Sequence, residues 1–133
     1  MNFHYPLTTL GKPLGGLLAG LLVAFSLQVQ AADVSPGAAA LKQGMALFDK
    51  GQLRKAEQMV NKANKLGFTR LEEVQQAHKT LAFIQCGTHR PALCEKSFEE
   101  ALKLDPSFKL SAVERKNPLW TPTFNKVKQR LSK

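Results

Sequence analysis

The residues of this chain whose side chains could act in catalysis or bind a metal are His78, Cys86, His89 and Cys94, which lie close together in the sequence. A thiol beside an imidazole can act as a nucleophile, and Cys and His can ligate zinc. His78 precedes Cys86 by eight residues, about two helical turns and beyond hydrogen-bond reach, and His89 is expected in a solvated turn. The four have no recognised zinc spacing, and the sequence lacks a Gly-rich phosphate loop, a His-Glu-x-x-His pair and a Gly-x-Ser-x-Gly turn. We therefore expect a protein that is not an enzyme and holds no metal or cofactor.

A charge-free segment near the N-terminus predicts export. Residues 14–27 carry no charge and number 14, fewer than the roughly 20 that a membrane-crossing helix needs. Val29-Gln30-Ala31 follows, with small residues at both ends as in a signal-peptidase site. We expect a signal peptide over residues 1–31 and a periplasmic or secreted mature chain. An uncleaved membrane anchor is the alternative.

Export changes what the cysteines are expected to do, because exported chains meet an oxidising environment. Cys86 lies near the end of one expected helix and Cys94 just inside the next, on either side of the turn over residues 87–91. Residues at similar distances from a tight turn can face one another, so we predict a disulfide between Cys86 and Cys94. The alternative is a reduced, buried thiol at Cys94, where helix packing requires a small residue.

Four segments of the mature chain carry apolar residues at helical spacing, and none alternates long enough for a confident strand. The first expected helix starts at Ser35-Pro36, with Ser35 as its cap. Thr69 with Glu72 predicts a capping box at the start of the third helix. The expected stops of the four helices are Gly51, Gly67, Gly87 and Asp105. The fold class that follows is all-α.

These helices repeat as two pairs. A shift of 38 residues aligns Gly44 with Ala82, Ala56 with Cys94, Val60 with Phe98, Ala63 with Ala101 and Leu66 with Leu104. Small residues fall on small ones and large on large, as stacked helix hairpins require. With the closing Leu104-Asp105-Pro106, the pattern resembles the tetratricopeptide repeat (TPR), a helix–turn–helix unit of about 34 residues. The resemblance implies that residues 32–106 form two TPR-like hairpins, at about 36–67 and 70–106.

Residues 107–133 are expected to cover the open end of this array, because two repeats alone leave a face unburied. Thr121 as a cap and Pro122 in the first turn predict a last, basic helix. Trp120, in the Pro-containing linker before it, is expected to plug the second repeat. The alternative for Trp120 is an anchor for a partner protein, since Trp is enriched at interface hot spots.

A narrower resemblance involves three segments, Ala77–Cys86, Asp105–Leu110 and Pro118–Pro122, together with the second cysteine. In combination they resemble small exported TPR proteins associated with type VI secretion. Those proteins are generally lipoproteins, and the lipid-accepting cysteine is missing from this chain. The resemblance implies a role in assembly within the cell envelope.

Surface and charge supply the remaining expectations about function. Stacked hairpins offer a concave face suited to a peptide or a partner helix, so the main hypothesis is an adaptor that binds another envelope protein. Its candidate contact residues come from the first and third helices: Lys42, Gln43, Asp49, Gln75, His78, Lys79 and Gln85. Simple solvation is the alternative for each of them. The oligomeric state is left open.

A second hypothesis follows from the net charge of +9, made by 19 Lys and Arg against 10 Asp and Glu. Such a charge favours anionic neighbours, although export makes nucleic acid an unexpected partner. The chain would then bind anionic envelope polymer or lipid headgroups through a basic patch on the last helix. The patch consists of Lys126, Lys128, Arg130 and Lys133. The alternative is a solvated face without a ligand.

Overall fold

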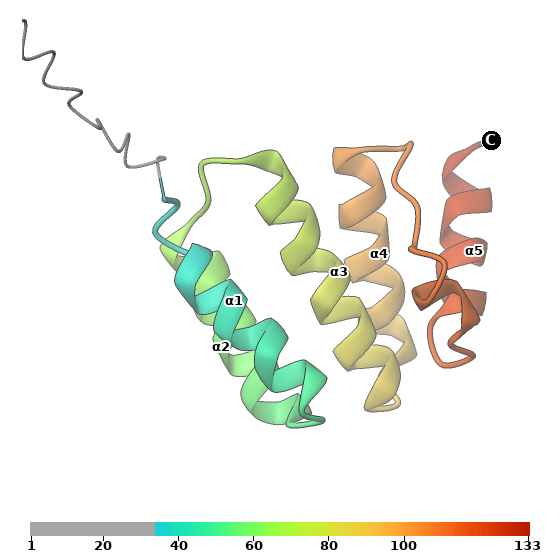
Figure 1. Cartoon of the computed structure of the whole chain (residues 1–133). Coiled ribbons are helices and arrows are strands. Elements are labelled where there is room, and N and C mark those ends of the chain that lie inside the picture. Colours follow the sequence, from blue (N-terminus) through green and yellow to red (C-terminus); the bar gives the residue numbers. More distant parts are fainter. Residues whose placement is uncertain (1–33) are drawn as a thin grey trace, which may run out of the picture. The chain divides into compact units, whose positions relative to one another are not determined.

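The computed structural model describes residues 34–133, which are all-helical as the sequence predicts (Figure 1). Its α-helices are α1 (Ala38–Asp49), α2 (Leu53–Leu66), α3 (Leu71–Gly87), α4 (Pro91–Leu104) and α5 (Thr121–Leu131). A 3₁₀-helix, Glu114–Lys116, lies between α4 and α5. The expected signal peptide, residues 1–31, lies outside the described residues. Within residues 34–133, none of the helices has the length and apolar character that crossing a bilayer requires.

The helix positions agree with the sequence prediction, but the predicted caps are wrong. Ser35 does not cap α1; its Oγ accepts the backbone N–H of Thr69 at 2.9 Å and lies 2.7 Å from the Thr69 hydroxyl. Thr69 therefore forms no capping box, and α3 starts without a side-chain cap. Thr121 is the first residue of α5, and its hydroxyl donates to the Glu114 carbonyl at 3.3 Å. These polar side chains bind segments outside the helices that they were expected to cap.

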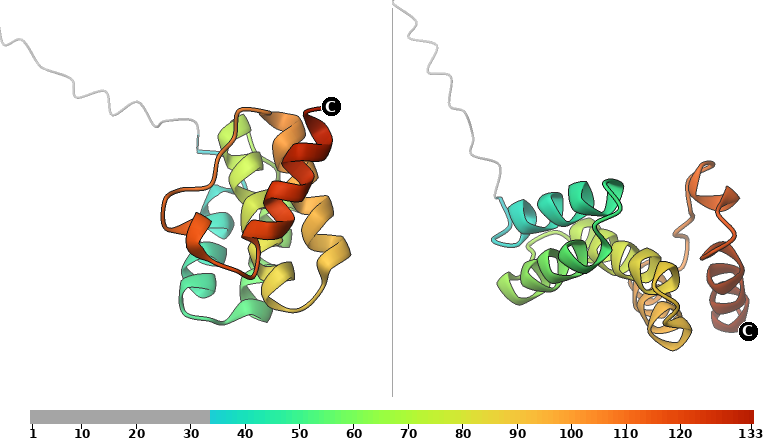
Figure 2. Two further views of the ribbon diagram at one scale, coloured as in Figure 1. Left: turned by 90° about the vertical axis from the view of Figure 1, so that its right-hand side faces the viewer. Right: turned by 90° about the horizontal axis from the view of Figure 1, so that it is seen from below.

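The helices pair as hairpins, with α1 packed mainly on α2 and α3 on α4 (Figures 1 and 2). Gly44 of α1 is buried where the first two helices meet. A Cβ added at Gly44 would lie 2.7 Å from Cγ2 of Val60 and 3.3 Å from the Ala56 carbonyl oxygen. In the second hairpin Ala82 and Cys94, the residues aligned with Gly44 and Ala56, are fully buried. Small residues thus let the paired helices approach closely in both hairpins.

This close approach predicts that Gly44→Ala destabilises the protein. Alanine is the better helix former by about 1 kcal/mol, but overpacking a tight contact costs about 1–3 kcal/mol, so we expect a net loss of about 1 kcal/mol. The matched control is Gly87→Ala, where the new Cβ would meet Cδ1 of Leu53 at an ordinary 3.6 Å. We expect that control to unfold at the same or a slightly higher urea concentration. A Gly44→Ala variant more stable than the parent would contradict the packing described here.

Two apolar clusters form the core. The first joins α1, α2 and α3 and consists of Ala40, Leu41, Val60, Ala63, Ala77 and Leu81. The second joins α3, α4 and the C-terminal part and consists of Ala82, Phe83, Cys86, Cys94, Phe98, Leu102, Leu110, Phe124 and Val127. Helix α3 contributes to both clusters, so it holds the two hairpins together.

Helix α5 covers the side of α4 that faces away from the first hairpin (Figure 2). Phe124 packs edge-on against Phe98 of α4, with ring centroids 5.3 Å apart, and against Phe108 at 5.7 Å. Val127, one turn further along α5, has no exposed surface. The C-terminal part therefore buries the apolar face that the second hairpin would otherwise expose.

Candidate functional site

A shallow groove of about 350 Å³ runs along the exposed side of α1. It is lined by Ala38, Leu41, Lys42, Met45, Ala46 and Asp49 of α1 and by Glu73 of α3. The half-buried Met45 and the exposed Ala46 provide its accessible apolar part, because Leu41 is only 5% exposed. Lys42 and Asp49 are exposed and stand seven residues apart, about 10 Å along the helix. The groove therefore combines apolar surface with one cation, Lys42, and two carboxylates, Asp49 and Glu73.

The charge of Glu73 is already satisfied by neighbouring groups. Its carboxylate accepts a hydrogen bond from the Arg70 guanidinium at 2.5 Å and another from the Ser35 hydroxyl. The hydrogen bond from Arg70, followed by that from Ser35, holds the pKa of Glu73 below its ordinary value. Glu73 thus fastens the segment before α1 to α3, and we do not assign it to a partner.

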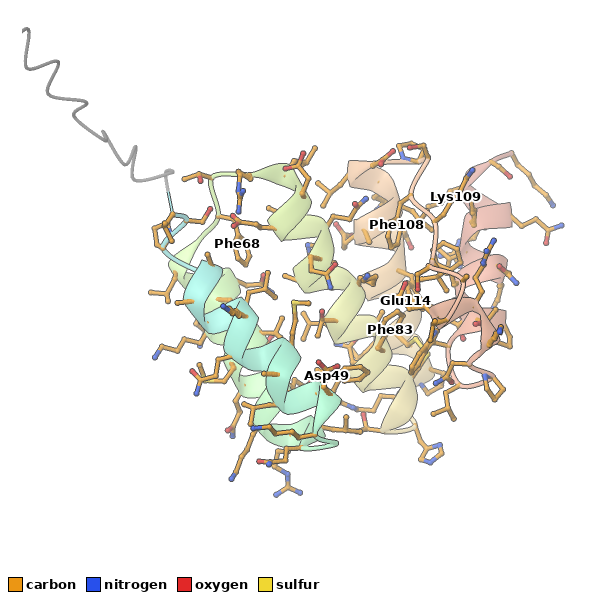
Figure 3. All side chains as sticks on the ribbon, viewed as in Figure 1. Asp49, Phe68, Phe83, Phe108, Lys109 and Glu114 are labelled. Carbon is orange, nitrogen blue, oxygen red and sulfur yellow. A yellow bond between two sulfur atoms is a disulfide. The ribbon has the colours of Figure 1, made fainter. Side chains whose placement is uncertain are left out.

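The side of α3 next to the groove is covered by the segment between α4 and α5 (Figure 3). Trp120 stacks on Phe83, with ring centroids 4.2 Å apart, and lies 6.3 Å from Phe48 of α1. Its Nε1–H donates to the backbone carbonyl of Glu114 at 2.9 Å. Trp120 is therefore engaged in packing, as the first of its two sequence interpretations predicts.

Lys79, a predicted contact residue, is held by the same segment. Its ammonium lies 2.8 Å from Glu114, and both side chains are largely buried, with 15% and 22% exposed. Burial alone would raise the pKa of Glu114, but hydrogen bonds from Lys79 and the Ser111 backbone outweigh it, so the pKa is lowered. Lys79 is therefore paired within the chain, with a residue of the segment before α5.

The other predicted contact residues differ in their exposure. Gln43 is exposed on α1, beside the groove rather than in its lining. Gln75 and His78 are half-buried; Gln75 donates to the Ala101 carbonyl at 3.2 Å, and burial lowers the pKa of His78. Gln85 was wrongly predicted as a surface residue, because it is 7% exposed and its amide oxygen accepts the Ser97 hydroxyl at 2.6 Å.

The predicted basic patch on α5 is a set of intramolecular contacts. Lys126 lies 2.6 Å from Glu95, while Arg130 lies 3.3 Å from Glu95 and 2.9 Å from Glu99. The hydrogen bond from Lys126 is the main reason why the pKa of Glu95 lies below its ordinary value. Lys126 and Arg130 are still 64% and 47% exposed, as a solvated face requires, and acidic residues of α4 pair with them. The sequence did not predict the pairing with α4, because the interpretation treated α5 by itself.

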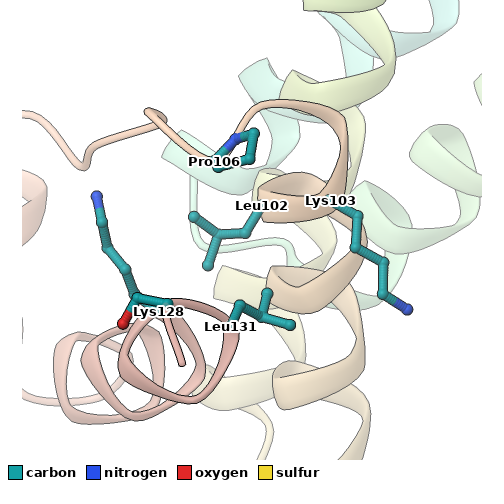
Figure 4. Close-up of a pocket in the computed structure, with 6 residues that line it drawn as sticks. Leu102, Lys103, Pro106, Lys128 and Leu131 are labelled. Carbon is teal, nitrogen blue, oxygen red and sulfur yellow. The ribbon is translucent and has the colours of Figure 1, made fainter.

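Lys128 also points to a neighbour within the chain. It donates to the Phe108 carbonyl at 2.8 Å and lies 5.6 Å from the centre of the Phe124 ring. Of the predicted patch, Lys126, Arg130 and Lys133 are exposed and Lys128 is half-buried. Beside Lys128, a pocket of about 220 Å³ opens between α4 and α5 (Figure 4). It is lined by Leu102, Lys103, Pro106, Lys128, Leu131 and Ser132.

The cysteines form the predicted disulfide, with their Cα atoms 5.2 Å apart. Cys86 ends up at the last turn of α3 and Cys94 in the first turn of α4. Both thiols are thereby consumed, which excludes the thiolate nucleophile and the zinc set considered from the sequence in this oxidised state. Among residues 34–133, no group of three His, Cys, Asp or Glu side chains is arranged to hold a metal ion.

No protein-family model, curated protein or solved structure matches the chain. Function is therefore argued from the groove on α1, from the hairpins that shape it and from the distribution of charge.

Proposed function

We propose that this chain is a non-catalytic, TPR-like adaptor that holds a segment of a partner protein in the groove along α1. The arrangement of small residues supports the TPR-like assignment: Gly44, Ala56 and Ala63 in the first hairpin and Ala82, Cys94 and Ala101 in the second are all buried. In stacked hairpins of this type, the first helix of each pair lines the concave face. Helices α1 and α3 occupy those places.

The single observation that carries the proposal is the composition of the groove. A partner side chain placed over Met45 and Ala46 would bury apolar surface, which is the main favourable term in association. An acidic group beside Lys42 and a basic group beside Asp49 would set the direction of the bound segment. The fitting ligand is thus a short amphipathic segment with an apolar centre and opposite charges about 10 Å apart.

Export to the cell envelope is part of the proposal. The charge-free segment 14–27 and Val29-Gln30-Ala31 support it, and so does the disulfide, because such bonds persist in oxidising compartments. Within the envelope, an adaptor of this size suits a multi-protein assembly such as a secretion system. Its partner is then another envelope protein.

Site-specific crosslinking in living cells tests the proposal. A photo-reactive residue in place of Ala46, which is exposed in the groove, is expected to give one predominant adduct with an envelope protein. The matched control carries the same residue in place of Lys96, which is exposed on α4, and is expected to give none. Exchanging the rim charges (Lys42→Glu with Asp49→Lys) should lower the adduct yield about tenfold, which corresponds to about 1.4 kcal/mol. The groove would be ruled out if the probes at positions 46 and 96 gave the same adduct. It would also be ruled out if exchanging the charges of Lys42 and Asp49 left the adduct yield unchanged.

A further inference from the structure

The outer face of α2 carries cations that the sequence interpretation did not single out. Arg54, Lys55, Lys62 and Lys65 are all exposed. At 3.6 residues per turn, they fall within an arc of about 100° and extend over about 16 Å of the helix. We call these four residues the α2 stripe.

Within the part of the chain that the structure describes, the α2 stripe differs from the cations of α5 in having no acidic partners. Among residues 34–133, no carboxylate lies within ion-pair distance of the four side chains. The one carboxylate of α2, Glu57, receives both terminal nitrogens of Arg90 at 2.9 Å each. Arg90, just before α4, therefore neutralises the charge of Glu57. The positive potential of the stripe is left uncompensated by α2 itself.

We propose that the α2 stripe docks the protein on an anionic lipid surface. A straight row of mainly Lys side chains suits a plane of negative headgroups, to which each cation adds about 1 kcal/mol without a specific geometry. Leu66, at the end of α2 and one turn after Lys62, is 48% exposed and supplies an apolar group for the interface. Single-stranded nucleic acid is the poorer fit, because the face carries no aromatic side chain for base stacking.

The proposal is independent of the partner groove. The groove lies on α1 and the stripe on α2, the two helices of the first hairpin, which Figure 2 shows from below as two separate neighbouring ribbons. A chain docked through α2 would keep the α1 groove accessible to a protein partner. Failure of either proposal leaves the other standing.

Vesicle co-sedimentation of the full chain tests the stripe. The probes are phosphatidylcholine vesicles with and without phosphatidylglycerol, and the readout is the difference between the two partition coefficients. Any association through the charge-free residues 14–27 adds equally to both. We expect a strong preference for the anionic vesicles that falls as salt is raised.

The decisive variant neutralises three members of the stripe: Lys55→Gln, Lys62→Gln and Lys65→Gln. Gln matches Lys in helix propensity, so α2 should remain folded, and the anionic preference should fall about a hundredfold. The matched control is Lys96→Gln, Lys109→Gln and Lys133→Gln, which removes the same charge from other exposed positions. It should retain most of the preference, and circular dichroism should show that both variants are folded.

Three outcomes would overturn the assignment. Equal losses in the two variants would mean that binding follows net charge alone. Equal binding to neutral and anionic vesicles would remove the electrostatic contact. Tighter binding to a DNA duplex than to the anionic vesicles, lost in the stripe variant, would assign the face to nucleic acid instead.

Discussion

Replacing Trp120 with Ala is expected to lower the free energy of unfolding by about 3 kcal/mol, as for other large-to-small aromatic changes in packed sites. The substitution removes a ring that stacks on Phe83 at 4.2 Å and approaches Phe48 at 6.3 Å. It also leaves the Glu114 carbonyl without the indole N–H that it accepts. Urea unfolding followed by far-ultraviolet circular dichroism measures the change.

Two controls separate packing from surface exposure. Leu119→Ala, at the neighbouring position, alters a side chain that is 51% exposed and should change stability by no more than about 0.5 kcal/mol. Trp120→Phe keeps an aromatic ring but loses the donor, so a loss of about 1 kcal/mol from that hydrogen bond is expected. If Trp120→Ala were as stable as the parent, the packing role would be wrong and the anchor for a partner would be favoured.

Removal of the disulfide has the second largest expected effect. The bond joins residues eight apart, and closing so short a loop stabilises the folded state by about 2.5 kcal/mol in the chain-entropy account. For a domain of this size, that loss corresponds to a fall in Tm of about 10–20 °C. Thermal unfolding with and without a reductant measures it.

The matched control for reduction is the Cys86→Ala, Cys94→Ala variant, whose Tm should be low from the start and unaffected by the reductant. Cys94 has no exposed surface and Cys86 is 9% exposed, so reduction is expected to be slow until the helices separate. Rapid alkylation of two thiols in the native, unreduced protein would contradict the assignment of the bond.

The helices of this chain were predictable because their signals are local. Gly51 and Gly67, which follow the first two helices, have positive φ values of 70° and 87°. Glycine adopts positive φ without the steric cost that other residues incur, so it commonly ends helices. Pro91 stands in the first turn of α4, where its missing N–H costs nothing. The disulfide was predictable for the same reason, since it spans one turn between neighbouring helices.

The errors concern side chains whose partners lie far away in the sequence. Ser35 and Thr69 are residue types that commonly cap helices, yet they bind each other across the junction of the first and third helices. Lys126 and Arg130 are exposed, as their spacing indicates, but nothing in the sequence indicates that both pair with Glu95 of α4. A sequence shows which groups can pair and leaves open which of them meet. The candidate site was therefore predicted only in part, through Lys42 and Asp49.

The packing of each helix mainly on its neighbours in the sequence bears on how quickly the chain folds. Contacts of that kind close short loops, and helical domains dominated by them fold in about microseconds to milliseconds. The contact between Trp120 and Phe48 is the exception, because it joins the C-terminal segment to α1 across most of the described chain. Its long loop makes it a late step. The fluorescence of this single Trp therefore reports the completion of folding rather than its beginning.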